Sequence, residues 1–233
     1  MANGGIIGPV NNPTAYSASG VWEQEEQYQA QVGGIWPPIP AIGLNSCRFN
    51  SGSSDYLNRT PGSTSNRRTF TLSAWVKRSN ISSSTIFSAY GNASSTRDTV
   101  RFSSADTLEI FQYTGSFTYV LRTNRVFRDP SAWYHIVVAF DTTQGTEGNR
   151  IKIYVNGVQE TSFGTETYPS QNLDTFFNAS SPYITYIGRD GSDTTPYFNG
   201  YLAEAVSIDG TQNAVTDFGE FDEDSGIWKP IDV

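Results

Sequence analysis

The chain has 233 residues and a mass of 25.6 kDa, enough for one large domain or one domain with an appendage. Charged residues make up 16% and aromatic residues 14%, and there are 21 glycines, a composition typical of an all-β protein rather than a helical bundle or a disordered chain. The 15 basic and 23 acidic residues give a net charge of −8, which repels phosphate backbones and argues against nucleic-acid binding.

Residues 1–40 differ in composition from the rest of the chain and form the first predicted segment. Good helix formers fill 23–31, acidic residues at the start favour a helix N-terminus, and two consecutive glycines end it. Trp22 and Trp36 bracket this helix, Tyr28 lies within it, and a proline-rich spacer follows. Two interpretations stay open: the tryptophans fold back onto the main domain, or the arm docks into a partner through Trp22, Tyr28 and Trp36.

From residue 43 onward the sequence has the period of two that half-buried strands show. The clearest strand spans 69–76, and Asn156-Gly157 predicts a hairpin with a type I′ turn because both residues accept positive φ. A second hairpin is predicted at 114–116. Further strands are predicted at 45–50, 85–90, 98–103, 107–113, 116–122, 133–140, 150–155, 158–163, 183–188 and 198–208. This series of short strands predicts an all-β sandwich or jelly roll.

Four stretches, in order, resemble the strands of laminin-G-like, concanavalin A-like jelly rolls. They are FTLSAWVK at 70–77, WYHIVVAF at 133–140, IYVNG at 153–157, and YIG at 186–188 followed by FNGYLAE at 198–204. The resemblance covers about residues 43 to 210. It implies a lectin-like jelly roll over 41–212, preceded by an arm at 1–40 with one helix and followed by an acidic C-terminal extension at 213–233.

The flanking segments are similar to a narrower group, the lectin-like domains of virion proteins from tailed bacteriophages. This likeness rests on SCRFN at 46–50, NRRTF at 66–70, VKRS at 76–79 and DFGEFDEDSGIW at 217–228. The EQYQAQ segment at 26–31, between the two tryptophans, is similar to a short module of phage structural proteins. The resemblance implies attachment of the arm to other virion proteins of the capsid or tail.

The sequence contains few candidate catalytic residues. His135, the only histidine, has no cysteine or second histidine with which to build a triad or a zinc site, so we expect a hydrogen-bonded core residue. Glu220, Asp222 and Asp224 approximate the spaced carboxylates of a retaining glucanase, but they follow the jelly-roll strands and are interpreted as a solvated acidic loop. Glu204 is interpreted as an anchor for a neighbouring loop. We therefore expect no enzymatic activity.

Candidate ligand-binding residues lie on the predicted loops. Asp190 and Asp193, with Asp98 as a further ligand, are the best candidates for calcium, although Asp-Gly at 190–191 is also a standard turn pair. No cofactor is required. Sugar binding needs aromatic platforms beside polar side chains on exposed loops. On this ground we predict ligand contacts at Tyr168, Tyr183, Asp190, Asp193 and Tyr197.

Together these features predict a non-enzymatic phage virion protein, such as a capsid decoration, a head fibre or a tail-associated fibre, that binds host-surface glycans weakly. The usual symmetry of fibres favours a homotrimer. The lone Cys47 excludes an internal disulfide, and no apolar run approaches the roughly 20 residues that cross a bilayer. With no secretory signal, we expect assembly in the host cytoplasm and no membrane insertion. Two alternatives stay open: a glycan depolymerase of the same fold, and an architectural cement protein without a ligand.

Overall fold

The computed structural model describes residues 24–34, 45–91, 96–191 and 197–233. The chain divides into two compact units between residues 44 and 45. In the first unit the predicted helix is present as α1, Gln24–Val32, which ends before Gly34 in the left-handed region at φ 67°. Tyr28 is an exposed residue of this helix. Trp22, Trp36 and the proline-rich spacer lie outside the described residues.

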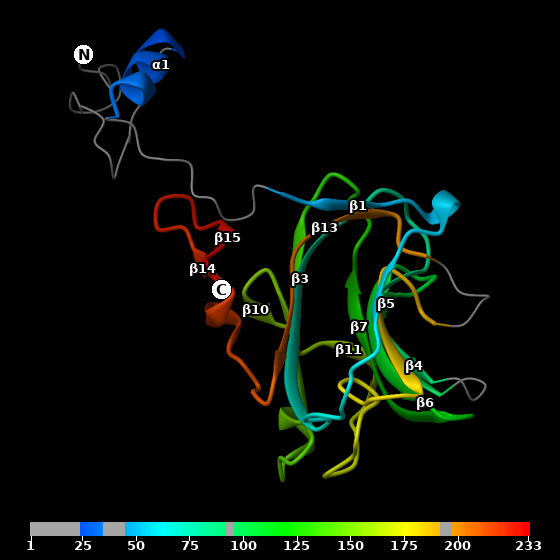
Figure 1. Ribbon diagram of the computed structural model, residues 1–233. Coiled ribbons are helices and arrows are strands. Elements are labelled where there is room, and N and C mark those ends of the chain that lie inside the picture. The colour runs from blue at the N-terminus through cyan, green and yellow to red at the C-terminus, as the bar shows by residue number, and fades with distance from the viewer. Residues whose placement is uncertain (1–23, 35–44, 92–95, 192–196) are drawn as a thin grey trace. The chain divides into compact units, whose positions relative to one another are not determined.

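The second unit is an antiparallel sandwich of two large sheets (Figure 1). The strand order is β1-β13-β3-β8-β9-β10 in the six-stranded sheet and β11-β7-β6-β5-β4-β12-β2 in the seven-stranded sheet. This arrangement confirms the predicted all-β sandwich. The six-stranded sheet consists of β1 (Cys47–Phe49), β3 (Thr69–Arg78), β8 (Tyr134–Asp141), β9 (Ile151–Val155), β10 (Val158–Gln159) and β13 (Gly200–Asp209). The seven-stranded sheet consists of β2 (Leu57–Arg59), β4 (Ser84–Gly91), β5 (Arg97–Phe102), β6 (Thr107–Tyr113), β7 (Phe117–Val126), β11 (Phe163–Thr167) and β12 (Tyr183–Ile187).

The main core lies between the two sheets, and β3 shows how the sequence builds it. Phe70 and Leu72 point into the sandwich, while the alternate residues Thr71 and Ser73 face the outer surface of the six-stranded sheet. The facing sheet contributes residues such as Ile110 from β6 to the same cluster. The alternation read from the sequence is therefore the alternation between core and outer face.

The residues after β13 cover part of that outer face. They form a short 3-10 helix, η3 (Val215–Asp217), and a two-stranded sheet of β14 (Gly219–Phe221) and β15 (Trp228–Pro230). Phe218 and Trp228 pack with Val137 of β8 in a second apolar cluster. The segment predicted as an acidic extension thus belongs to the same compact unit as the sandwich.

Several local predictions can be compared with the strands. The hairpin at Asn156-Gly157 is confirmed, with φ values of 49° and 79°. The hairpin at 114–116 is confirmed between β6 and β7. The single strand predicted over 158–163 is wrong: β10 pairs with β9 in one sheet, whereas β11 begins at Phe163 and pairs with β7 in the other. The three-residue strands β2, β14 and β15 lie outside the predicted strand ranges, whereas β1, also three residues long, lies within the predicted strand at 45–50.

Two further 3-10 helices lie in connections, η1 (Ser51–Ser53) between β1 and β2, and η2 (Glu147–Asn149) before β9. None of the helices in the described parts of the chain is long and apolar enough to cross a membrane.

Candidate functional site

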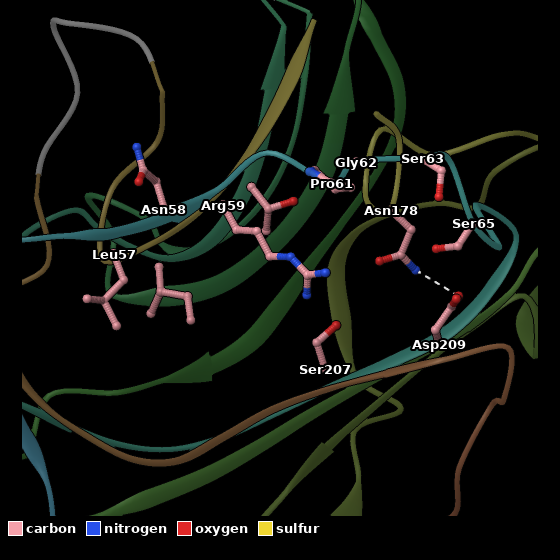
Figure 2. A pocket seen from close by; sticks show the side chains of 12 residues that line it. Leu57, Asn58, Arg59, Pro61, Gly62, Ser63, Ser65, Asn178, Ser207 and Asp209 are labelled. Atoms are coloured by element: carbon pink, nitrogen blue, oxygen red, sulfur yellow. Dashed lines mark hydrogen bonds between the residues drawn. The ribbon is translucent and has the colours of Figure 1, made fainter. Parts of the chain in front are cut away.

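The short edge strand β2 separates two surfaces. Arg59 lies opposite Thr185 of β12, and Asn58 lies opposite Tyr186. Because successive side chains of a strand point to opposite faces, β2 presents Arg59 and Asn58 to different sides of the sheet. Figure 2 shows the Arg59 side chain pointing into a pocket between the sheets, whereas the side chain of Asn58, which also lines the pocket, points away from the Arg59 guanidinium.

The outer side carries three tyrosine rings around one arginine, which we call the tyrosine face: Tyr56, Tyr186, Tyr197 and Arg189. The ring of Tyr56 lies 5.8 Å from that of Tyr186 and 6.2 Å from that of Tyr197, measured between centroids. The Cζ atom of Arg189 lies 4.8 Å from the centroid of Tyr56 and 5.3 Å from those of the other two rings. Each such contact stabilises the cluster by about 0.5–1 kcal/mol at an exposed site.

The exposure of the three rings differs in a way that suits a binding surface. Tyr186 is 8% exposed and fixed in the sheet, Tyr197 is half-buried, and Tyr56 is 39% exposed. Arg189 is held by its backbone, since the Ser88 hydroxyl donates to its carbonyl oxygen at 2.8 Å. The tyrosine face is therefore a firmly positioned aromatic surface with one ring open to solvent.

The loop after β12 is fixed by an ion pair as well. The Asp190 carboxylate, 1% exposed, lies 3.1 Å from Nε of Arg97 on β5. The same arginine covers the rings of Phe111 and Tyr113 on β6. The Asp190 carboxylate is therefore buried and paired with Arg97, and its predicted contact with a ligand stays a prediction.

The other side of β2 faces a pocket of about 660 Å³, which we call the edge pocket. It exists because β1 covers β13 only at residues 200–202, which leaves residues 206–209 of β13 paired with β3 alone. The open edge of one sheet then faces the edge strand β2 of the other. The edge pocket is lined by Leu57, Asn58, Arg59, Pro61, Gly62, Ser63, Ser65, Asn178, Thr185, Ile187, Ser207 and Asp209.

One wall of the edge pocket is tightly hydrogen-bonded. Asp209 Oδ1 accepts from the backbone N–H of Asn66 and from the Asn178 side-chain amide, each at 3.2 Å (Figure 2 shows the second bond). The backbone of Asn178 is tied to the same loop, because its carbonyl accepts from the Ser65 N–H at 3.0 Å. The side chain of Arg59, in contrast, is exposed and forms no hydrogen bond or ion pair with any described residue.

The predicted aromatic ligand residues lie in different places. Tyr197 belongs to the tyrosine face. Tyr183, at the start of β12, stacks on Phe176 with centroids 4.6 Å apart. Tyr168 follows β11, at the opposite edge of the seven-stranded sheet, and its hydroxyl donates to Glu166 at 3.0 Å. The structure therefore does not bring Tyr168 and Tyr197 together in one site.

Asp193 lies outside the described residues, so the predicted calcium site is seen only in part. Asp98 does not join Asp190: its side chain points into the sandwich, where it accepts from the hydroxyl of Tyr119 at 2.7 Å. Among the residues that the structure describes, no three His, Cys, Asp or Glu side chains gather as a metal site would require. Calcium binding stays a prediction.

The carboxylates considered for catalysis are held in an exposed hairpin. Glu220 and Asp222 both contact Lys229 Nζ, at 3.3 and 3.2 Å, and Asp222 also accepts from the Ser225 hydroxyl and backbone N–H. These hydrogen bonds lower the pKa of Asp222 to about 2. Glu204 is an exposed residue in a bulge of β13, with φ 45°. His135 is a buried, hydrogen-bonded residue of β8, which confirms its predicted structural role.

Sequence reasoning selected Tyr197 of the tyrosine face but missed Tyr56, Arg189 and Arg59. Tyr56 precedes β2 and Arg59 is its last residue. A strand of three residues leaves no periodic signal in the sequence. Arg189 follows the YIG segment, and its adjacency to three tyrosines depends on the pairing of β12 with β2. Only the aromatic content of the segments near 56, 186 and 197 could have suggested the cluster.

The two antiparallel sheets form a jelly-roll sandwich. Residues 51–212 match the concanavalin A-like lectin/glucanases superfamily, and the chain belongs to this family. A comparison with curated protein sequences finds no match.

Solved structures share the fold at low sequence identity. One is domain 4 of AbnA, a GH43 extracellular arabinanase from Geobacillus stearothermophilus in complex with arabinotriose, with 18% identity, 72% of each chain covered and a TM-score of 0.55. Another comprises domains LG4-5 of the mouse laminin alpha1 chain, with 15% identity, 75% of this chain and 44% of that chain covered, and a TM-score of 0.51. At these identities the likeness is one of fold.

Proposed function

We propose that this chain is a non-enzymatic, glycan-binding virion protein of a tailed bacteriophage. The tyrosine face carries the glycan part of the proposal. An exposed aromatic ring, a fixed cation and the nearby amide of Asn58 are the groups with which proteins hold a sugar ring and its hydroxyls. Membership of a superfamily of lectins and glucanases supports the same assignment.

The site is shaped for weak binding. The tyrosine face is a surface patch rather than an enclosed cleft. Of its three rings, only that of Tyr56 is exposed. We therefore propose that many copies on one particle act together, because multivalency raises overall affinity without new contacts. We propose that the displayed unit is a homotrimer. Light scattering on the full chain measures its mass and so tests this oligomeric state.

The virion part of the proposal rests on the sequence similarity of the flanking segments to phage proteins. In this proposal the arm at 1–40 attaches to a capsid or tail protein through Trp22, Tyr28 and Trp36, and the particle is assembled in the host cytoplasm. The exposed position of Tyr28 on α1 is compatible with such a contact. Mass spectrometry of purified particles tests it: peptides of this chain are expected in the virion, and their absence contradicts the proposal.

The non-enzymatic part is supported by the state of the candidate carboxylates. Glu220 and Asp222 share Lys229 in a surface hairpin rather than standing free on a sheet face. Incubation of the full chain with the glycans it binds should release no shorter saccharides. Release of oligosaccharides would contradict this part of the proposal.

The glycan part is tested on an array of bacterial surface polysaccharides with the full chain and Tyr56→Ala. We expect binding to at least one glycan and at least a tenfold loss of affinity in the variant. Tyr201→Ala is the matched control: Tyr201 is 37% exposed against 39% for Tyr56, and it too lies beside an arginine, with Arg48 Cζ at 5.3 Å. Equal loss in both variants, or no bound glycan, would reject the tyrosine face as the site.

A further inference from the structure

The edge pocket holds a cation, the Arg59 guanidinium, that no described residue neutralises. Among the described residues the guanidinium of Arg59 has neither a hydrogen-bond acceptor nor a carboxylate within ion-pair distance. Figure 2 shows its guanidinium in the middle of the pocket, on the side that faces Ser207, Asn178 and Asp209. A planar guanidinium with five N–H donors matches a carboxylate in a bidentate arrangement.

The wall of the pocket opposite Arg59 favours a different chemical group of a ligand. Asp209 is a hydrogen-bond acceptor with one oxygen, Oδ1, already engaged by Asn66 and Asn178. A carboxylate of this kind accepts hydrogen bonds from hydroxyl groups, whereas it repels a second anion. The hydroxyl of Ser207, on the same strand, can donate or accept.

The two walls together describe one ligand. It carries a carboxylate at one end, for Arg59, and hydroxyl groups at the other, for Asp209 and Ser207. The volume of about 660 Å³ lies within the roughly 300–1,000 Å³ of small-molecule sites. We propose that the edge pocket binds an acidic monosaccharide unit, a sugar that bears both a carboxylate and hydroxyls.

The wall that would hold the sugar is built before any ligand arrives. The Asn178 amide bridges Asp209 and the carbonyl oxygen of Asn66, at 3.2 and 2.9 Å, and Thr64 bonds Ser180 at 2.9 Å in the same contact. These bonds join the loop after β2, the loop before β12 and the end of β13. Since little backbone ordering is left for the binding step, the entropic cost of binding falls.

This inference does not depend on the tyrosine face, because β2 directs Arg59 and Asn58 to opposite sides. A glycan with neutral and acidic units could occupy both surfaces, yet each surface can fail alone. The two proposals are therefore separated by variants: Arg59→Gln removes the cation of the edge pocket, and Tyr56→Ala removes the open ring of the tyrosine face.

The test is a titration of the isotope-labelled full chain with D-glucuronate, followed by amide chemical shifts, with D-glucose as the matched neutral probe. We expect glucuronate to shift the amides of residues 57–65, 178 and 207–209, and glucose to bind at least tenfold more weakly. Arg59→Gln should weaken glucuronate binding at least tenfold, and Arg59→Lys should restore part of it, since charge remains but the bidentate geometry is lost.

Two control variants make the result specific. Lys152→Gln removes the same charge from β9, on the other sheet, and should leave glucuronate binding unchanged. Tyr56→Ala should leave it unchanged as well. The inference is overturned if glucuronate shifts none of these amides, if Arg59→Gln binds it like the unmodified chain, if glucose binds equally well, or if Tyr56→Ala abolishes the shifts.

Discussion

The indole N–H of Trp228 donates a hydrogen bond of 2.9 Å to Nδ1 of His135, which joins the C-terminal hairpin to the six-stranded sheet. Because Nδ1 accepts, the ring proton is on Nε2, which lies 2.9 Å from the hydroxyl of Ser73 and donates to it. Trp75 stacks on the same ring with centroids 4.8 Å apart. The imidazole is therefore held neutral in a buried network that links three parts of the chain.

This network makes stability sensitive to acid through His135. Burial lowers the pKa of His135 from 6.5 to about 4, so the unfolded chain takes up a proton at a higher pH than the native protein does. The stabilisation is present above pH 6.5 and is lost as the pH falls toward 4, by up to about 3 kcal/mol. Urea unfolding across this range should show the free-energy difference between the unmodified chain and His135→Gln narrowing as the pH falls. A difference that does not change with pH contradicts the account.

Asp98 acts in the opposite direction. Burial raises its pKa to about 6 although Tyr119, Gln112 and the backbone N–H of Phe176 donate hydrogen bonds to it. The native protein thus binds this proton more tightly than the unfolded chain, and the stabilisation, present below pH 3.8, is lost as the pH rises through 6. Asp98→Asn should gain stability relative to the unmodified chain between pH 4 and 7, by up to about 3 kcal/mol. A constant difference in urea unfolding over that range would show that Asp98 keeps its ordinary titration.

Glycine is required at position 157 by its backbone conformation and by its contact with Trp228. Comparison with Gly115 separates the two effects. The φ of Gly157 is 79°, and a Cβ atom there would lie 2.3 Å from the Trp228 ring. Gly115 has φ 101° with nothing within 4 Å of its Cβ position. Gly115→Ala should cost about 1 kcal/mol from backbone strain alone, and Gly157→Ala about 3 kcal/mol or more because Trp228 must also move. Equal losses in thermal or urea unfolding would mean that the contact with Trp228 is unimportant.

Trp228 itself should anchor the C-terminal hairpin. Trp228→Ala removes a large buried side chain and should cost about 3–5 kcal/mol. Trp228→Phe keeps a ring but leaves Nδ1 of His135 without its donor, for a cost of about 1–3 kcal/mol. Hydrogen exchange should show faster amide exchange over 213–233 in both variants. Unchanged exchange there would argue that the hairpin is held by other contacts.

The sandwich could be predicted because its long strands carry a period of two. In β3, Phe70 and Leu72 alternate with Thr71 and Ser73, and the structure places the two sets on opposite faces. The turn at Asn156-Gly157 could be predicted because its conformation depends on two adjacent residues. Each of these signals is contained in a few consecutive positions of the chain.

The candidate sites could not be predicted in the same way, because their residues meet only after the sheets have formed. Arg59 and Asp209 belong to different sheets and are separated by 150 positions along the chain. Asp190 has the polar character expected of a ligand residue, yet its carboxylate is buried against Arg97. Burial of this kind depends on tertiary contacts that no local pattern contains.

The proposed function makes this chain a virion protein that displays a lectin-like domain through its arm at 1–40. Electron imaging of phage particles labelled with an antibody to the chain tests this most directly. Particles carrying the full chain should be compared with particles that carry a chain lacking residues 1–40. We expect label at one defined position on the head or tail of the first and none on the second. If the full chain is present in the lysate but intact particles from that lysate carry no label, the proposal is contradicted.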